Sequence, residues 1–166
     1  ANDGVNGWEL WKSDGTEAGT VMVKDIRSGP NSSNPYFLVS INSTLFFSAN
    51  DGINGAELWK SDGTEAGTQL FKDIAAVASS EHPGSLTVCE DKMFFTTDDG
   101  IHGKELWATD GTDAGTHLVK DIRTDNGAGS SPSYLRVING ILYFTANEDN
   151  SSSKLWRSDG TEAGTY

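Results

Sequence analysis

Four times, the chain carries the stretch Glu57-Leu58-Trp59-Lys60-Ser61-Asp62-Gly63-Thr64-Glu65-Ala66-Gly67-Thr68, with few changes between the copies. The other copies occupy residues 9–20, 105–116 and 154–165. Their tryptophans lie 48, 48 and 49 residues apart, at Trp11, Trp59, Trp107 and Trp156. A constant period of this length indicates a solenoid, a propeller or an array of repeats.

The second period, residues 49–96, predicts four short β-strands. It opens with Asp-Gly and Asn-Gly pairs, which favour turns and disfavour a helix start. Strands are predicted at 57–61, 68–74, 85–89 and 92–96, with tight connections at Asp62-Gly63 and Glu90-Asp91. No stretch has an apolar pattern of helical period long enough for a helix, so the chain is predicted to be all-β.

The strand after each two-residue turn contains three apolar residues in a row, which predicts a strand buried on both faces. These runs are Leu45-Phe46-Phe47, Met93-Phe94-Phe95 and Leu142-Tyr143-Phe144. A sheet buried on both faces lies between two like sheets. The fold expected is therefore a β-propeller built of four-stranded antiparallel blades of about 48 residues. A stacked solenoid is less compatible, because its repeats are usually about 20 to 30 residues long.

The chain is interpreted as one β-propeller segment with repeats at 1–48, 49–96 and 97–145 and a partial repeat at 146–166. From the inside outward, a blade should contain the segment types of Leu86, Met93, Leu58-Trp59 and Leu70-Phe71. This order predicts the outer half of one blade, two whole blades and at least three strands of a fourth. Four blades are the minimum for a ring, so the ring is incomplete here. It would need the remaining blades of a longer parent chain or another copy of itself.

The repeated stretch and its continuation into Lys-Asp-Ile closely resemble the ELWxxDGT repeat family, whose tandem units occur in large secreted and cell-surface proteins, mostly bacterial. The resemblance covers nearly the whole chain. It implies a propeller-like extracellular repeat region, and it transfers no catalytic residues. The fourth copy departs from the pattern, since Lys154 replaces the glutamate and residues 148–153 replace the glycine-containing loop.

The charge composition of the chain disfavours some classes of binding partner. The net charge is −12, from 24 acidic and 12 basic side chains without a basic cluster, which disfavours nucleic acid and anionic lipid. No apolar run approaches the roughly 18 to 20 residues that would insert into a membrane. The only cysteine, Cys89, excludes an intrachain disulfide and is interpreted as a small core residue.

Two kinds of tryptophan are distinguished. The repeated ones are interpreted as packing between blades, with each indole N–H hydrogen-bonded to a neighbour. Trp8 differs, because the equivalent positions hold Ala56, Lys104 and Ser153, so no repeat geometry requires an aromatic residue there. Trp8 is a candidate ligand-binding residue, together with Asn6, Asn54 and His102; the alternative for Trp8 is an incidental exposed aromatic.

Repeated carboxylates suggest two further roles. The Asp-Gly pairs at Asp14, Asp62, Asp110 and Asp159 are interpreted as turn-forming. In the other loop, oxygen ligands of the type that calcium prefers recur at Asp3, Glu9, Asp51, Glu57, Asp99 and Glu105. Calcium is the only cofactor that the pattern suggests, and the alternative is hydrogen bonding within Asx turns.

The function expected is that of a non-catalytic extracellular binding or adhesion module, secreted or at the cell surface. Its ligand, a glycan or a surface protein, would be bound by the variable loops at 3–8, 51–56 and 99–104 with those at 27–36, 75–84 and 123–133. One alternative is a structural repeat that self-assembles into a surface layer, filament or stalk. Another is a fragment of a secreted propeller enzyme such as a glycan hydrolase, although no nucleophile, phosphate-loop or HExxH motif occurs.

Overall fold

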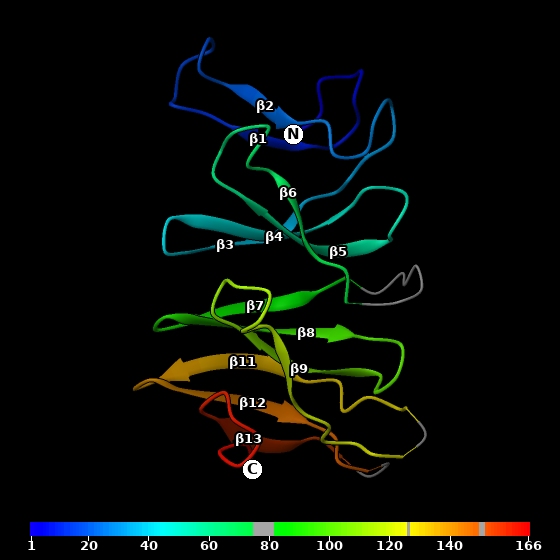
Figure 1. Ribbon diagram of the computed structural model, residues 1–166, viewed down its shortest axis with the longest axis vertical. Coiled ribbons are helices and arrows are strands. Elements are labelled where there is room, and N and C mark those ends of the chain that lie inside the picture. The colour runs from blue at the N-terminus through cyan, green and yellow to red at the C-terminus, as the bar shows by residue number, and fades with distance from the viewer. Residues whose placement is uncertain (75–81, 126, 150–151) are drawn as a thin grey trace. The chain divides into compact units, whose positions relative to one another are not determined.

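The computed structural model describes residues 1–74, 82–125, 127–149 and 152–166, and within these ranges the protein is all-β (Figure 1). Thirteen strands are found in the described ranges, and no helix. The prediction of an all-β chain is confirmed. None of these residues therefore forms a helix of the length and hydropathy that crossing a membrane requires.

The strands follow the predicted segments closely. The first six are β1 (Leu10–Lys12), β2 (Val21–Lys24), β3 (Tyr36–Ile41), β4 (Thr44–Asn50), β5 (Ala56–Ser61) and β6 (Gln69–Lys72). The others are β7 (Gly84–Cys89), β8 (Lys92–Asp98), β9 (Lys104–Thr109), β10 (His117–Lys120), β11 (Ser133–Ile138), β12 (Ile141–Ala146) and β13 (Lys154–Ser158). The outer strand predicted at 68–74 is shorter than expected, because regular pairing is limited to β6.

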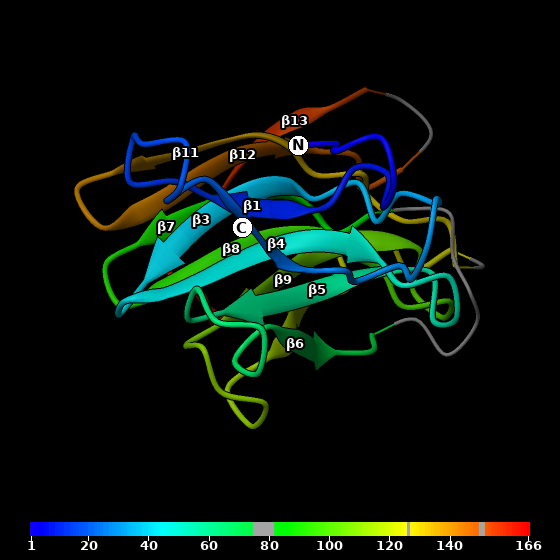
Figure 2. The ribbon, with the colours of Figure 1, turned by 90° about the horizontal axis from the view of Figure 1, so that it is seen from above.

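The strands form four antiparallel sheets, ordered β1-β2, β3-β4-β5-β6, β7-β8-β9-β10 and β11-β12-β13. Figure 2 shows β3, β4, β5 and β6 side by side in that order. Each larger sheet joins the hairpin of one period to the Leu-Trp strand of the next period, as the predicted order of segment types required. Within the described residues the sheets do not close into a ring.

The chain divides into two compact units. Of the described residues, unit 1 holds 1–73 with His82, and unit 2 holds Ile74 with 83–166. In unit 1, β1 and β2 lie beside the β3–β6 sheet (Figure 1), and the core between them contains Leu10, Val23, Ile26, Phe47, Ala49 and Trp59. In unit 2, a second core joins the β7–β10 and β11–β13 sheets through residues that include Phe94, Leu106, Val119, Leu142 and Phe144.

The apolar runs in β4 and β8 are buried on both faces, as predicted. Phe46 and Phe47 are 1% and 0% exposed, and Phe94 and Phe95 are both 0% exposed. In β12 the burial alternates instead, since Phe144 is buried while Tyr143 is only half-buried. Two-face burial therefore applies to the two four-stranded sheets and not to the β11–β13 sheet.

Lysine side chains tie neighbouring sheets together within each unit. The Nζ of Lys24 donates to the carbonyl oxygen of Thr68 at 2.8 Å, and that of Lys120 donates to Thr165 at the same distance. Each acceptor is the last residue of a repeated stretch. Each repeated stretch thus contributes strands to its own sheet and also a carbonyl oxygen that accepts a hydrogen bond from the preceding sheet.

Trp59 packs in the core of unit 1 and Trp156 against the core of unit 2, in line with the predicted packing between sheets, but the predicted hydrogen bonding of the repeated tryptophans was wrong. Trp59 and Trp107 are 6% and 9% exposed, while Trp11 and Trp156 are half-buried. The indole N–H of all four is buried without a hydrogen-bond partner among the described residues. An unsatisfied donor costs about 1–3 kcal/mol, whereas burying the 150–250 Å² of such a ring gains about 4–6 kcal/mol. Apolar burial therefore outweighs the lost hydrogen bond.

The inner strands β3, β7 and β11 share an unusual backbone feature. Each has a register shift in its pairing, and Phe37, Ser85 and Tyr134 at the shift have φ angles of 56°, 54° and 56°. Left-handed φ is uncommon for bulky residues, and such bulges redirect side chains. Phe37 and Tyr134 are accordingly 51% and 78% exposed.

Replacing Trp59 by alanine is expected to lower the free energy of unfolding by about 3 to 5 kcal/mol, because it removes a buried ring from the core of unit 1. Trp8→Ala is the matched control. Its ring is 57% exposed, so the change should stay within about 0.5 kcal/mol. Urea unfolding of both variants measures the difference. A Trp59→Ala variant as stable as the parent would contradict the packing role.

Candidate functional site

The repeated Asp-Gly turn is held by its own side chains. The Oδ1 of Asp62 accepts hydrogen bonds from the Thr64 backbone N–H at 2.8 Å and the Thr64 hydroxyl at 2.7 Å, and the Gly67 N–H donates to that hydroxyl at 3.0 Å. The Gly63 N–H donates to the Ser61 hydroxyl at 3.0 Å. A Cβ on Gly67 would lie 2.1 Å from the Asp62 carboxylate, so glycine is required there.

The same contacts recur around Asp14, Asp110 and Asp159, which confirms that these aspartates form turns. Hydrogen bonds from the following threonine lower the pKa of each of the four carboxyl groups. The twelve-residue stretch is thus explained by turn geometry and packing.

The glutamates at the start of the stretch point inward. The Glu9 carboxylate, 1% exposed, accepts hydrogen bonds from the Ile26 N–H at 3.0 Å, the Ser33 N–H at 2.9 Å and the Ser33 hydroxyl at 2.6 Å. Glu105, 0% exposed, accepts the same two bonds from Ser130 at 2.7 and 2.5 Å. These carboxylates hold both ends of the link between one sheet and the next.

Burial raises the pKa of Glu105, and the hydrogen bonds from Ser130 offset part of that effect. Glu57 is also buried, at 1% exposure. Its equivalent of Ser33 and Ser130 is Glu81, which lies outside the described residues. In the fourth period Lys154 takes the glutamate's place and forms an exposed ion pair with Glu148.

The loop aspartates form Asx turns. The Oδ1 of Asp51 accepts hydrogen bonds from the N–H groups of Ile53 and Asn54, both at 2.8 Å, and its Oδ2 accepts one from the Asn54 side-chain amide at 2.7 Å. Asp3 makes the same bonds with Val5 and Asn6, and Asp99 makes them with Ile101 and His102. Asn6, Asn54 and His102, predicted as ligand-binding, thus lie against their own loop aspartates.

The structure does not bring the predicted calcium ligands together. Across the described ranges, no group of three or more histidine, cysteine, aspartate or glutamate side chains is arranged to hold a metal ion. Asp3, Asp51 and Asp99 are engaged in their loops, whereas Glu9, Glu57 and Glu105 are buried behind them. Cys89, the only thiol, is buried in the core of unit 2, where burial raises its pKa.

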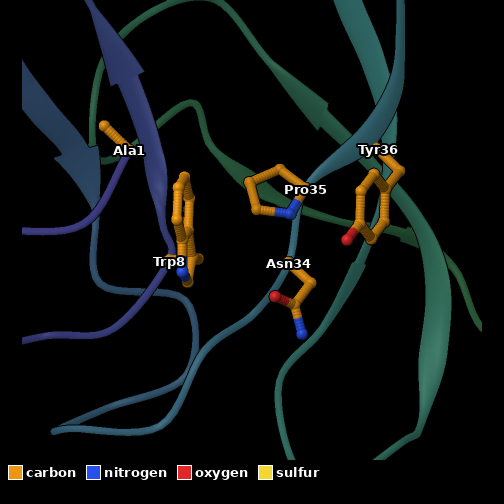
Figure 3. A pocket seen from close by; sticks show the side chains of 5 residues that line it. All are labelled: Ala1, Trp8, Asn34, Pro35 and Tyr36. Atoms are coloured by element: carbon orange, nitrogen blue, oxygen red, sulfur yellow. The ribbon is translucent and has the colours of Figure 1, made fainter.

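Of the predicted ligand-binding residues, Trp8 lines a cavity in unit 1. The cavity has a volume of about 350 Å³ and is lined by Ala1, Trp8, Asn34, Pro35 and Tyr36, all in unit 1. Figure 3 shows the rings of Trp8 and Tyr36 on either side of Pro35, with the Asn34 amide below them. Trp8 and Tyr36 are 57% and 54% exposed.

The link after β2 fixes the position of Trp8. Its N–H donates to the Ser32 hydroxyl at 2.9 Å, and its carbonyl oxygen accepts from the N–H groups of Ser33 and Asn34, both at 3.1 Å. A Cβ on Gly7 would lie 2.5 Å from the Asn31 carbonyl oxygen, so the glycine, at φ 70°, permits this close approach. The loop that carries Trp8 and the link at 31–34 are therefore joined by hydrogen bonds beside the cavity.

Sequence reasoning placed residue 36 in a variable loop but did not single out Tyr36. The signal was present, because the positions equivalent to Tyr36 hold Gly84 and Ser133. Tyr36 thus has the same property that singled out Trp8, an aromatic side chain in one period alone. The preceding proline recurs as Pro35, Pro83 and Pro132, which marks it as structural.

Comparison with known proteins adds no family to these observations. No family model matches the chain, and no curated protein is significantly similar to it.

Millimolar Ca²⁺ is expected to leave the melting temperature unchanged, because the loop carboxylates already accept hydrogen bonds from their own loops. Thermal unfolding with Ca²⁺ and with a chelator measures this. A rise in melting temperature that Asp51→Asn reduces would instead support the predicted calcium site.

Stability should depend on pH through His102, which replaces the asparagines of the first two periods. Its Nδ1 lies 2.7 Å from Asp99 Oδ2, and this hydrogen bond raises the pKa of His102. Burial raises the pKa of Asp99, but hydrogen bonds from His102 and Ile101 outweigh it and the net pKa is lowered. The His102 contribution is complete below its ordinary pKa of 6.5 and is lost as pH rises through the raised value.

The Asp99 contribution is present above its ordinary pKa of 3.8 and is lost as pH falls through the lowered value. The parent protein should therefore gain stability over His102→Asn chiefly between these two ordinary pKa values. Melting temperatures of both proteins between pH 3 and 9 test this; curves that stay parallel over the whole range would contradict it.

Proposed function

We propose that this chain is a non-catalytic β-propeller segment of an extracellular protein, and that it binds a glycan in the cavity of Trp8 and Tyr36. The observation that carries the proposal is the pairing of two half-exposed aromatic rings, each unique to the first period, around one concave surface. Residues that repeat in every period are accounted for by turns and packing, whereas these two are not.

The chemistry of the cavity suits a sugar. An aromatic face offers an apolar surface. The polarised C–H groups of a pyranose ring interact favourably with that face. The Asn34 amide supplies both donor and acceptor for hydroxyl groups, and it stands beside the rings (Figure 3). Ligand sites of this kind combine apolar walls with a few fixed polar groups.

The propeller assignment rests on the sheets. Each four-stranded sheet combines the hairpin of one period with the outer pair of the next, which is how propeller blades join consecutive repeats. The secreted or cell-surface location rests on the resemblance to ELWxxDGT repeats. No catalytic step is assigned to any residue.

A structural role is a second candidate, supported by one exposed apolar position. Leu155 in β13 is 73% exposed, whereas the equivalent Leu10, Leu58 and Leu106 are 3%, 0% and 0% exposed. A further sheet of the same kind would cover it, from a longer chain or from another copy. Self-assembly of this kind and glycan binding are compatible in one protein.

Trp8→Ala is expected to weaken glycan binding about tenfold or more, because it removes one of the two rings that form the cavity. A glycan array identifies the ligand, and calorimetry measures its affinity for the parent and the variant. Tyr134→Ala is the matched control, since that ring is more exposed and does not line this cavity.

Absence of any glycan bound on the array, or affinities that Trp8→Ala leaves unchanged, would contradict the proposal. Sedimentation of the same samples separates the second candidate, because a large self-assembly without glycan affinity would favour the structural role.

A further inference from the structure

A second cavity in unit 1 holds an arginine whose charge has no ion-pair partner among the residues that the structure describes. The cavity has a volume of about 460 Å³. It is lined by Ile26, Arg27, Ser28, Asn31, the loop residues Asp51, Gly52 and Ile53, and Trp59. Among the described residues the Arg27 guanidinium makes no ion pair and one long hydrogen bond, from Nη1 to the Ser32 carbonyl oxygen at 3.5 Å.

The nearest candidate carboxylate in the lining is already engaged. Asp51 accepts three hydrogen bonds from Ile53 and Asn54, so its oxygens are directed into its own loop. Gly52 allows Arg27 to lie close to that loop, because a Cβ on Gly52 would be 3.0 Å from the Arg27 Nε. The guanidinium therefore lies beside the loop, and with one long hydrogen bond most of its five N–H donors stay available.

The third period shows what such an arginine binds when the chain supplies a partner. Arg123 occupies the position of Arg27, and its Nε and Nη2 donate to Asp125 Oδ1 and Oδ2 at 2.6 and 3.1 Å. Both arginines follow an Asp-Ile pair, and the residue two positions beyond is Asp125 in one period and Gly29 in the other. The first period thus retains the guanidinium and lacks the carboxylate.

Arg27 also lies next to the Trp8 cavity. Ser32 accepts the Arg27 hydrogen bond at its carbonyl oxygen and the Trp8 N–H at its hydroxyl. One residue therefore contacts both the arginine of one cavity and the tryptophan of the other. The two cavities are thus connected through Ser32, which makes a ligand of two or more units the relevant probe.

We propose that Arg27, with Ser28 and Asn31, forms an anion subsite that takes a carboxylate or sulfate group of an acidic glycan, in the place that Asp125 fills in the third period. The guanidinium fork matches the two oxygens of such a group in a bidentate pair. In a chain of net charge −12, long-range repulsion opposes the approach of an acidic ligand, so recognition depends on this short-range contact. The inference rests on the proposed glycan-binding function and specifies its ligand class.

The test compares three probes with the parent protein by calorimetry: hexagalacturonate, its fully methyl-esterified form, and a sulfated galactan oligosaccharide of similar length. Hexagalacturonate should bind about tenfold to a hundredfold more tightly than its ester, the range expected for charge-assisted hydrogen bonds. Tight binding of the sulfated probe instead would identify sulfate as the group, because both anions use the same fork.

Variants separate the subsite from the aromatic cavity. Arg27→Gln should remove the preference for the acidic probe over the ester, and Arg27→Lys should retain only part of it because the charge remains without the fork. Arg123→Gln is the matched control and should leave the preference unchanged. Trp8→Ala should weaken binding of acid and ester alike.

If neither anionic probe binds more tightly than the ester, or if the preference for an anionic probe survives Arg27→Gln, the anion subsite is overturned while the Trp8 site stays in place. If none of the three probes binds at millimolar concentration, the anion subsite is also overturned. The glycan array then decides separately whether the Trp8 site holds, since it includes neutral sugars of other structure.

Discussion

The buried glutamate that begins each complete repeated stretch makes the hydrogen bonds on which the position of the neighbouring loops depends. Glu9 accepts hydrogen bonds from Ile26 and Ser33, which lie at the two ends of the link that follows β2. A link held at both ends has few conformations left to it. Its residues form walls of both cavities, so the positions of Arg27 and of the Asn34–Tyr36 wall follow from one carboxylate.

Burying that carboxylate is costly unless every oxygen is satisfied. Burial raises the pKa of the Glu105 carboxyl group, in the direction that this cost implies. Serine at positions 33 and 130 offsets it with a hydroxyl and a backbone N–H each. In the fourth period lysine replaces the glutamate, and the exposed Lys154 forms an ion pair with Glu148. In the first and third periods the glutamate and the serine therefore act as a pair, whereas the second period keeps a buried Glu57 with Glu81 at the serine position.

Much of the fold could be predicted from the sequence because its signals are local. Asp-Gly turns, two-residue hairpins and apolar runs depend on neighbours within a few residues, and the period then assigns strands to sheets. The inward direction of Glu9 could not be predicted, because its partner Ser33 is 24 residues away and a carboxylate beside Asp3 resembles a calcium ligand equally well. The unsatisfied indole N–H groups were missed for a related reason. Tryptophan was assumed to need a partner, and the apolar core outweighs that need.

The candidate site was only partly predictable, since the difference between periods identifies residues but not their neighbours. Trp8 stood out as an aromatic residue in one period alone, yet nothing local links it to Tyr36, 28 positions further on. Arg27 lies in the predicted variable loop at 27–36, but an arginine also occupies the equivalent position 123, so the sequence alone does not single it out. Only the contacts distinguish the two arginines: Arg123 is paired with Asp125, whereas Arg27 lines a cavity. In a repeat protein, a candidate site can therefore be sought where a residue is kept and its structural partner is lost, as well as where the residue itself changes.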